Sequence, residues 1–337
     1  VIAEVKKASR KVSTNAEIPQ VGGIAPRLRI GKSRWFNLLW LLPIGFVALI
    51  AAVALAQGLR NIPSVERFIT AHPGPIGPLR APGTTGFPLW VRLHHFFTLF
   101  FRIFIFRSGI QILSDHPRLY WTRHCTPGRD WFRVQKPVPP DPLWTAKQDS
   151  IALPGQVGLP GLRHSIGLAR WWHLGIDTLW LVNGLVFYIL LFATEQWLRL
   201  VPTTWEVFPN AVSTALQYLS LAFPAEESWT RYNSLQQITY FVTVFVAAPT
   251  SIVTGLMQSP AISNRLGSIG RMLNRQRARS IHFIALCWFL FFILAHVTLV
   301  FITDARVNLN MMFAGVHDDS WRGLLVFIPA MLLVAVT

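Results

Sequence analysis

The segment RSIHFIALCWFLFFILAHVTLVF, residues 279–301, decides how the rest of the chain is interpreted. It is almost entirely apolar, and an apolar run of this length is sufficient to cross a lipid bilayer as a helix. Two histidines interrupt it, His282 and His296. An imidazole in hydrocarbon is costly and usually serves a function. A fold for this chain must therefore explain two histidines on one spanning helix.

The composition of the whole chain indicates a membrane protein that packs against lipid. Of 337 residues, 52% are hydrophobic and only 14% are charged, whereas about 25% are charged in a soluble domain. The net charge is +16, and the basic residues responsible for it lie between the apolar runs. In that position they indicate membrane topology rather than nucleic-acid binding. Two distant cysteines, Cys125 and Cys287, predict neither a disulfide framework nor a paired-cysteine metal site. The chain begins on Val1 and stops at Thr337 inside an apolar run, so we expect a longer polypeptide or missing ends.

Apolar runs of about 20 residues predict the spanning helices. The first follows a long polar start, so we interpret it as an anchor rather than a cleaved signal peptide. A sixth run begins near residue 323. The five complete predicted spans are 36–59, 90–113, 168–193, 236–257 and 281–303.

The basic residues between the spans predict the orientation. Lys and Arg number eight, seven and five in one set of connecting segments, and three, two and two in the alternate set. Segments rich in Lys and Arg stay in the cytoplasm. We therefore expect a multi-pass protein of the inner (plasma) membrane with its N-terminus in the cytoplasm. The rich segments are 1–34, 114–167 and 258–280, and the poor ones are 58–89, 195–234 and 304–322.

The spacing of His282 and His296 limits what these two histidines can bind. Fourteen residues are close to four helical turns, so His282 and His296 share a face and lie about 21 Å apart along the axis. One metal ion needs its ligands within a few ångströms of one another. The pair therefore suits two stacked cofactors, one toward each membrane surface.

Histidines at matching depths occur on two other predicted helices. Helix 90–113 enters from outside and helix 168–193 enters from the cytoplasm, and each carries histidine near the end where it enters. Neutral imidazole is an axial ligand of haem iron. A single intramembrane histidine could instead be a hydrogen-bonded packing residue, but the matched depths predict two bis-histidine haem sites. The predicted pairs are His173 with His282, and His95 or His94 with His296.

Four segments resemble the haem helices of the membrane cytochrome b subunits of formate dehydrogenases and nickel hydrogenases. They are RLHHFFTLFFRIFIFRSG (92–109), RWWHLGIDTLWLVNGLVFY (170–188), YNSLQQITYFVTVFVAAPTSIVTGLMQSP (232–260) and RSIHFIALCWFLFFILAH (279–296). The third segment looks like the family's helix without a ligand, and the fourth has both ligands at the family's spacing. The resemblance covers residues 88–303.

The family's pattern for the first haem helix matches Arg92, His95, Phe96, Ser108 and Gly109, so the resemblance selects His95 over its neighbour as the ligand. It implies two haems b and electron exchange with a quinone or menaquinone. It is closest to a branch in which this module precedes a molybdopterin oxidoreductase domain of the sulfite-oxidase type, which is not in this chain. The redox partner would be that fused domain or a separate protein.

The leading helix is a departure from the common family layout and inverts the four haem helices. We therefore take the inner and outer haem from the charge distribution rather than from the family. The cytochrome b of quinol:cytochrome c complexes is a weaker comparison, because it needs two helices with widely spaced histidine pairs and this chain has one.

Charged residues near the histidines are candidates for contacts with haem. Arg102 lies in the middle of its span and needs an acidic partner, which a haem propionate would supply. Arg170 precedes His173 and could also meet a propionate or simply mark the cytoplasmic side. Asp177 could carry protons, orient an imidazole or pack by hydrogen bonding. Other candidates for a quinone site, which no spacing selects, are Tyr188, Asn183 and Gln237.

The predicted fold class is all-α, an integral membrane helical bundle with a four-helix di-haem core. The inner loop 114–167 is rich in aromatic residues and is either a docking surface or an interfacial loop. The predicted parts are a basic cytoplasmic segment 1–34, a leading helix 35–59, the cytochrome domain 88–303, and an outer loop with the start of a further helix, 304–337.

The function predicted from these features is electron transport. The chain would be a membrane cytochrome b that carries electrons through two haems between a quinone pool and a redox partner, as a subunit or module of an oxidoreductase. The alternative is a haem-free helical transporter or assembly scaffold that uses its histidines for protons or metal, but no matching inverted halves are evident. A ferric-iron reductase is a further alternative that lacks an outer metal-binding cluster.

Overall fold

The computed structural model describes residues 25–76, 86–126, 128–134, 150–151, 153–155, 157–158, 166–223 and 230–336. The chain divides into two compact units. The first comprises Val1–Leu42, Phe106–His173 and Gly255–Ser280. The second comprises Pro43–Ile105, Leu174–Thr254 and Ile281–Thr337.

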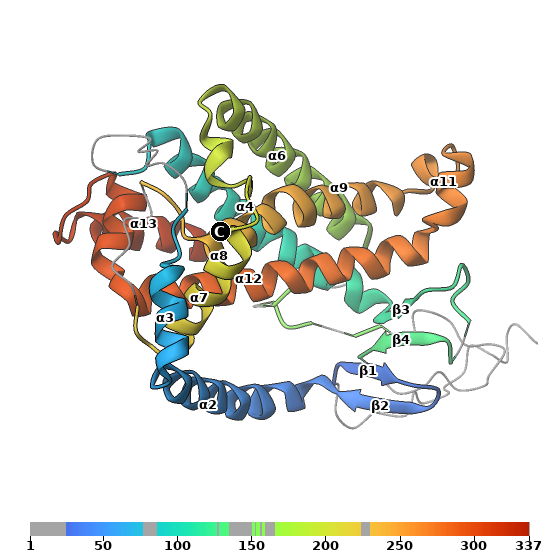
Figure 1. The fold of residues 1–337 in the computed structure, drawn as a ribbon. Helices are drawn as coiled ribbons and strands as arrows, with labels where there is room; N and C mark the ends of the chain where they lie inside the picture. The colour runs from blue at the N-terminus through green and yellow to red at the C-terminus, as the bar shows by residue number, and fades with distance from the viewer. Residues whose placement is uncertain are drawn as a thin grey trace, which may run out of the picture. The chain divides into compact units, whose positions relative to one another are not determined.

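The described part of the chain contains five helices long and apolar enough to cross a membrane, which confirms the predicted all-α integral membrane fold. They span Leu38–Arg60, Leu89–Asp115, Ile166–Ala193, Ser234–Met257 and Arg275–Ala314, with a shorter apolar helix at Arg322–Ala335. Figure 1 labels the longer α-helices. The helical elements are η1 (Leu38–Trp40), α2 (Leu41–Arg60), α3 (Pro63–Ala71), α4 (Leu89–Asp115), α6 (Ile166–Ala193), η2 (Gln196–Arg199), α7 (Val207–Leu219), α8 (Ser234–Phe241), η3 (Val242–Ala247), α9 (Ala248–Met257), α10 (Pro260–Ser263), α11 (Gly267–Met272), α12 (Arg275–Leu309), η4 (Asn310–Ala314) and α13 (Arg322–Val336).

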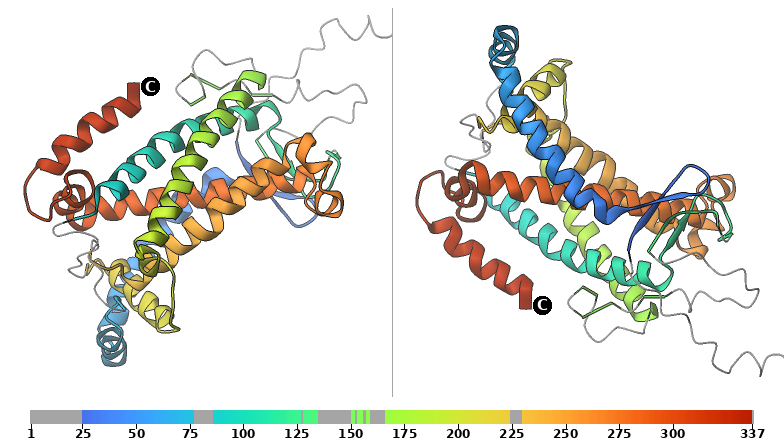
Figure 2. Two further views of the ribbon diagram at one scale, coloured as in Figure 1. Left: turned by 90° about the horizontal axis from the view of Figure 1, so that it is seen from above. Right: turned by 90° about the horizontal axis from the view of Figure 1, so that it is seen from below.

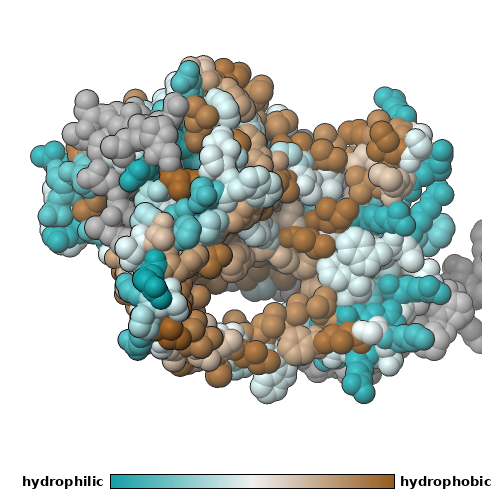
Figure 3. Space-filling view, viewed as in Figure 1, coloured by the Kyte–Doolittle hydropathy of each residue, from teal (hydrophilic) through white to brown (hydrophobic). Residues whose placement is uncertain are grey.

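Helix α2 presents apolar side chains on almost its whole circumference. Leu42 is 73% exposed and Phe46 is 65% exposed, and Ala56 is the one buried residue of the helix. Apolar residues accordingly cover the surface of this helix (Figure 3). A helix can expose such a surface stably when lipid surrounds it, because lipid tails are as apolar as its side chains. This exposure is compatible with the predicted role of the leading span as an anchor in lipid, which stays a prediction.

The span Ser234–Met257 is one continuous helix whose winding changes in its middle. Asn233 begins it with a capping box, in which its side chain accepts from the backbone N–H of Gln236 and the Gln236 side chain accepts from the backbone N–H of Asn233. A π-helical segment, η3, then precedes Pro249. Proline cannot donate a backbone hydrogen bond, and π-turns are one way in which helices absorb such an interruption.

A small antiparallel sheet in the first unit was not expected from the sequence. Its strands are β1 (Arg27–Ile30), β2 (Arg34–Asn37), β3 (Arg118–Tyr120) and β4 (Asp130–Arg133), in the order β2-β1-β4-β3 (Figure 1). Pairing of β1 with β4 joins the N-terminal basic segment to the inner loop. Strands of three or four residues carry too few alternating positions to be recognised from periodicity.

Charged residues stabilise the interior of this sheet. Asp130 is buried and forms ion pairs with Arg118, at 3.2 Å, and with Arg133, at 4.0 Å. The Arg133 guanidinium carbon also lies 3.5 Å from the centre of the Trp35 ring. Burial lowers the pKa of Arg133, and the charge of Asp130 opposes that effect. The shared acid therefore holds β3 and β4 of the inner loop together, and the cation–π contact of Arg133 with Trp35 joins this loop to the N-terminal hairpin.

Helix α12 continues beyond the predicted end of its span at residue 303. Asp304 has non-helical backbone angles, and its carboxylate accepts a hydrogen bond from the backbone N–H of Val307 at 3.1 Å. Aspartate commonly caps the first turn of a helix in this way. The apolar pattern ends at Asp304, but the cap starts further helical turns, and the predicted outer loop is shorter than expected.

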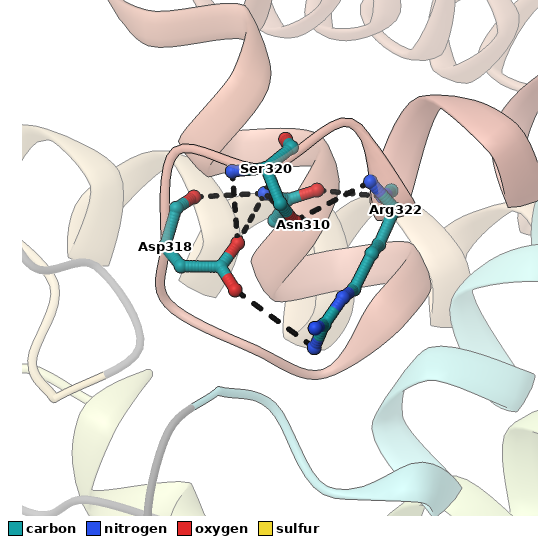
Figure 4. Close-up of polar contacts among 5 residues, drawn as sticks. Asn310, Asp318, Ser320 and Arg322 are labelled. Atoms are coloured by element: carbon teal, nitrogen blue, oxygen red, sulfur yellow. Dashed lines mark hydrogen bonds and ion pairs between the residues drawn. The ribbon is translucent and has the colours of Figure 1, made fainter.

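A polar turn connects η4 to α13 in the second unit. The buried Asn310 side chain donates to the backbone oxygens of Asp318 (2.8 Å) and Ser320 (2.7 Å) and to the Asp318 carboxylate (2.8 Å), and it accepts from the backbone N–H of Gly323 at 2.6 Å (Figure 4). Hydrogen bonds from Ser320 hold the pKa of the Asp318 carboxyl below its usual value. The turn leads the chain from the end of α12 into α13 (Figure 2).

Candidate functional site

Two of the predicted ligands face each other in the second unit. His95, on α4, and His296, on α12, have ring centres 6.2 Å apart. Metal–imidazole bonds of about 2 Å put the centres of two imidazoles on opposite sides of one metal about 6 Å apart. The Nδ1 atom of His95 is buried and has no hydrogen-bond partner among the described residues. The separation of the two rings therefore fits axial ligation of one haem iron.

Aromatic side chains surround this pair. Phe292, one helical turn before His296, stacks on its ring with the centres 5.6 Å apart and the planes 4° apart. The edge of Tyr240 meets the same imidazole at 6.3 Å, and Phe313 meets the ring of His95 at 6.3 Å. Such rings exclude water and restrict the orientation of both imidazoles.

His94 occupies a different environment from its neighbour. Its ring stacks on Phe187 with the centres 4.1 Å apart, and its Nε2 atom is hydrogen-bonded to the Thr98 hydroxyl at 3.3 Å. It is therefore a packing residue between α4 and α6. Helical periodicity places adjacent residues about 100° apart, so only one of two consecutive histidines can face His296.

His173, which the sequence predicts to lie toward the cytoplasm, is hydrogen-bonded to α4 within the first unit. The Ser108 hydroxyl lies 2.8 Å from Nδ1 of His173 and is hydrogen-bonded to it. A Cβ added at Gly109 would lie 3.4 Å from Cε1 of the same imidazole. Ser108 therefore orients the ring, and Gly109 permits its close approach to the helix backbone. With Nδ1 engaged in this way, Nε2 is the nitrogen that would bind iron.

The second inner histidine is held by α9 within the second unit. Nδ1 of His282 lies 3.1 Å from the Thr254 hydroxyl and 3.1 Å from the Ser251 carbonyl oxygen. Both inner histidines thus have Nδ1 engaged by a hydrogen-bond partner, which is the usual support for a metal-binding imidazole. The sequence resemblance pointed to a small residue at Ser108 but did not identify Thr254 or Ser251, because the helix that carries them has no ligand of its own.

Arg102 lies in the second unit between two aromatic rings. Its guanidinium carbon is 3.5 Å from the centre of Phe289 and 4.3 Å from that of Trp180, and the residue is 8% exposed. Asp177 interacts electrostatically with both Arg102 and His282. An acid on α6 thus lies near the arginine, although none is near it in sequence.

Arg170 is exposed near the start of α6 and interacts electrostatically with Arg279, also in the first unit. Two neighbouring guanidinium groups favour an anion between them. This environment is compatible with the predicted contact between Arg170 and a propionate, which stays a prediction.

The three residues considered for a quinone site differ in how they are engaged. The Tyr188 hydroxyl donates to the backbone oxygen of Val244 at 2.6 Å, and the Asn183 amide donates to the Thr98 hydroxyl at 3.0 Å. Both therefore tie helices together. Gln237 donates to the backbone oxygen of Val201 at 3.3 Å, and its buried Oε1 has no hydrogen-bond partner among the described residues.

Long apolar helices and a pair of histidines whose rings face each other define the class of the protein, a multi-pass membrane protein suited to haem. The family model described as prokaryotic cytochrome b561 matches residues 86–315, and the chain belongs to this family. No curated protein matches the chain, and no solved structure matches it. The predicted membership of a membrane cytochrome b family is confirmed.

Family membership and the spanning helices together define the general character of the protein. It is a multi-pass plasma-membrane cytochrome that binds haem b and transfers electrons. The matched residues include all four predicted ligands and the helices that carry them, whereas α2, the β1–β2 hairpin and α13 lie outside the match.

Proposed function

We propose that this chain binds two haems b and carries electrons between a membrane quinone and a redox partner. His95 and His296 would hold one haem, and His173 and His282 would hold the other. The observation that carries the proposal is the 6.2 Å separation of the His95 and His296 rings, which come from different helices. That separation matches the geometry of two imidazoles on one iron.

The second haem pair rests on three supports. Both of its histidines have Nδ1 engaged by a neighbouring helix, which leads each ring to present Nε2 to iron. Both lie near the cytoplasmic end of their predicted spans. The fourteen-residue spacing from His282 to His296 also resembles that of membrane cytochrome b subunits with two haems.

The residues of the chain bind, orient and shield the cofactors. Haem b supplies an iron centre that accepts and donates one electron at a time. Phe292, Tyr240 and Phe313 keep water from the outer pair of ligands. Arg170 would neutralise a haem propionate, because a buried carboxylate requires a cation or donors nearby. Arg102 is the second cation of the chain that would act on haem.

The proposed function requires two partners, a quinone and a redox partner, one at each end of the electron path. The distribution of Lys and Arg supports a cytoplasmic N-terminus. The quinone or menaquinone would dissolve in the surrounding lipid, and the redox partner would be a separate protein or a molybdopterin domain fused to this module.

The test is a reduced-minus-oxidised visible spectrum of the purified full chain with haem quantified per polypeptide. We expect two haems b in the native protein and one in each of the variants His95→Ala and His173→Ala. His94→Ala is the matched control, because it removes an adjacent imidazole that packs on Phe187, and it should retain both haems. Well-folded native protein without haem would overturn the proposal and favour a haem-free transporter or scaffold.

A further inference from the structure

The helices that carry the proposed ligands repeat functional residues every seven positions. Two helical turns are close to seven residues, so residues seven apart lie on nearly the same face, about 10 Å apart along the axis. On α12, Phe289 lies midway between His282 and His296. The series are His95, Arg102 and Gly109 on α4; His173, Trp180 and Phe187 on α6; and His282, Phe289 and His296 on α12.

The middle members of the three series meet in the second unit. Arg102 is held between Phe289, 3.5 Å from its guanidinium carbon, and Trp180, at 4.3 Å. An arginine between two ring faces is favoured by cation–π attraction, which grows when water is excluded. The stacking holds the positive charge at the level of Phe289 rather than at the level of either histidine of α12.

Phe289 lies seven residues from each histidine of α12, so the guanidinium group stacked on it lies at a level about midway between them, roughly 10 Å along the axis from each. Electrostatic interactions over such distances remain substantial in a medium of low dielectric. A nearby cation stabilises the less positive, ferrous form of a haem relative to the ferric form, so it raises the reduction potential. Asp177 is the nearby acid that opposes this effect, and it acts more on the haem of His282, with which it interacts.

We propose that Arg102 sets the reduction potentials of both haems from a position between them and is not the anchor of one propionate. This inference rests on the proposed function, because it requires two haems on α12. The aromatic rings of Trp180 and Phe289 fix the place from which the charge acts. The shared dependence on one charge would keep the two potentials in step, which favours electron exchange between the haems.

The experiment is a potentiometric titration of the purified holoprotein, followed in the visible haem bands, with haem counted per chain. We expect Arg102→Gln to retain two haems and to shift both midpoint potentials to lower values by comparable amounts. Arg102→Lys keeps the positive charge and should shift both much less. A shift confined to one haem would overturn the proposal in favour of a propionate anchor, and no shift in either would overturn it as well.

A second variant covers the case in which the single substitution prevents folding by leaving Asp177 buried without its cation. The paired variant Arg102→Gln with Asp177→Asn removes both charges. We expect the haem ligated by His296, identified from the bands lost in His95→Ala, to move to lower potential, and the haem of His282 to move less. A larger shift in the potential of the haem of His282 than in that of the haem of His296, or no shift in either potential, would contradict the inference. Native protein that lacks two haems would instead contradict the proposed function.

Discussion

The Ser108 hydroxyl lies 2.8 Å from Nδ1 of His173, across the contact between α4 and α6. Gly109, the next residue, brings its backbone close to the same imidazole. A serine and a glycine thirteen and fourteen residues after His95 therefore act on a histidine of another helix. This contact explains why a small residue followed by glycine belongs to the sequence pattern of the first haem helix.

Replacing Ser108 with alanine should alter the haem bound by His173. The substitution removes the hydroxyl that is hydrogen-bonded to Nδ1. With Nε2 on iron, Nδ1 would carry the proton, and loss of its acceptor would make the imidazole a weaker donor to iron. Loss of such a support typically costs about 10-fold to 100-fold in metal affinity. We expect weaker retention of one haem and a rise in its midpoint potential, measured by haem content on dilution and by potentiometric titration.

Ser114→Ala is the matched control for this change. Ser114 is also buried on α4, but its hydroxyl donates to the backbone oxygen of Gln111 and contacts no proposed ligand. It should leave both haems and both potentials unchanged. Equal effects of the two substitutions would show that a buried hydroxyl matters for packing alone.

Gly109 should tolerate alanine but not leucine. An added Cβ would lie 3.4 Å from Cε1 of His173, which is an ordinary contact distance, whereas a branched side chain would occupy the place of the imidazole. We expect Gly109→Ala to keep two haems and Gly109→Leu to keep one, as counted in the visible spectrum. A Gly109→Leu protein with two haems would show that His173 lies elsewhere in the holoprotein.

Asp130 should be essential for the sheet in the first unit. It is 1% exposed and is shared by Arg118 and Arg133, so Asp130→Ala leaves two buried guanidinium groups without their acid. Removing one partner of a buried ion pair typically costs about 3–5 kcal/mol. We expect rapid proteolysis between residues 115 and 135 in the variant, followed by mass spectrometry of the fragments.

The double variant Asp130→Leu with Arg118→Met tests whether charge or shape is responsible. It replaces the 3.2 Å ion pair by two apolar side chains and should recover much of the native resistance to proteolysis between residues 115 and 135. If Asp130→Ala resists proteolysis as well as the native protein does, the sheet does not depend on this acid.

The turn after η4 should depend on Asn310 and Gly323. Asn310→Ala removes the acceptor for the Gly323 N–H and the donors to Asp318 and Ser320, and each buried group left unsatisfied costs about 1–3 kcal/mol. A Cβ at Gly323 would collide with the backbone of Leu309 and Asn310. We expect both Asn310→Ala and Gly323→Ala to lower the thermal unfolding temperature in detergent.

Asp319→Asn serves as the control for the turn, because Asp319 is exposed and its side chain takes no part in the cluster around Asn310. Its unfolding temperature should match that of the native protein. A stable Asn310→Ala variant would show that water satisfies the groups released by the substitution.

The spanning helices could be predicted because each is a continuous apolar run, and lipid requires little else of a helix. Their bounds in the structure differ from the predicted ones by a few residues, except where Asp304 caps additional turns of α12. The four histidines could be found because they are polar residues in apolar surroundings. Pairing them by depth needed only the rise of a helix and the direction of each span.

The amino-acid sequence by itself determined the number of spans, the candidate ligands and the family of this protein, because hydrophobicity and spacing along one helix are local properties. Only the tertiary structure decided that His94 packs on Phe187, that Ser108 supports His173, and that Arg102 lies between Trp180 and Phe289. The sheet of β1 to β4 also emerged only there. These features depend on side chains that are distant in sequence, and their rotation and contacts are set by packing between helices and strands rather than by any local pattern.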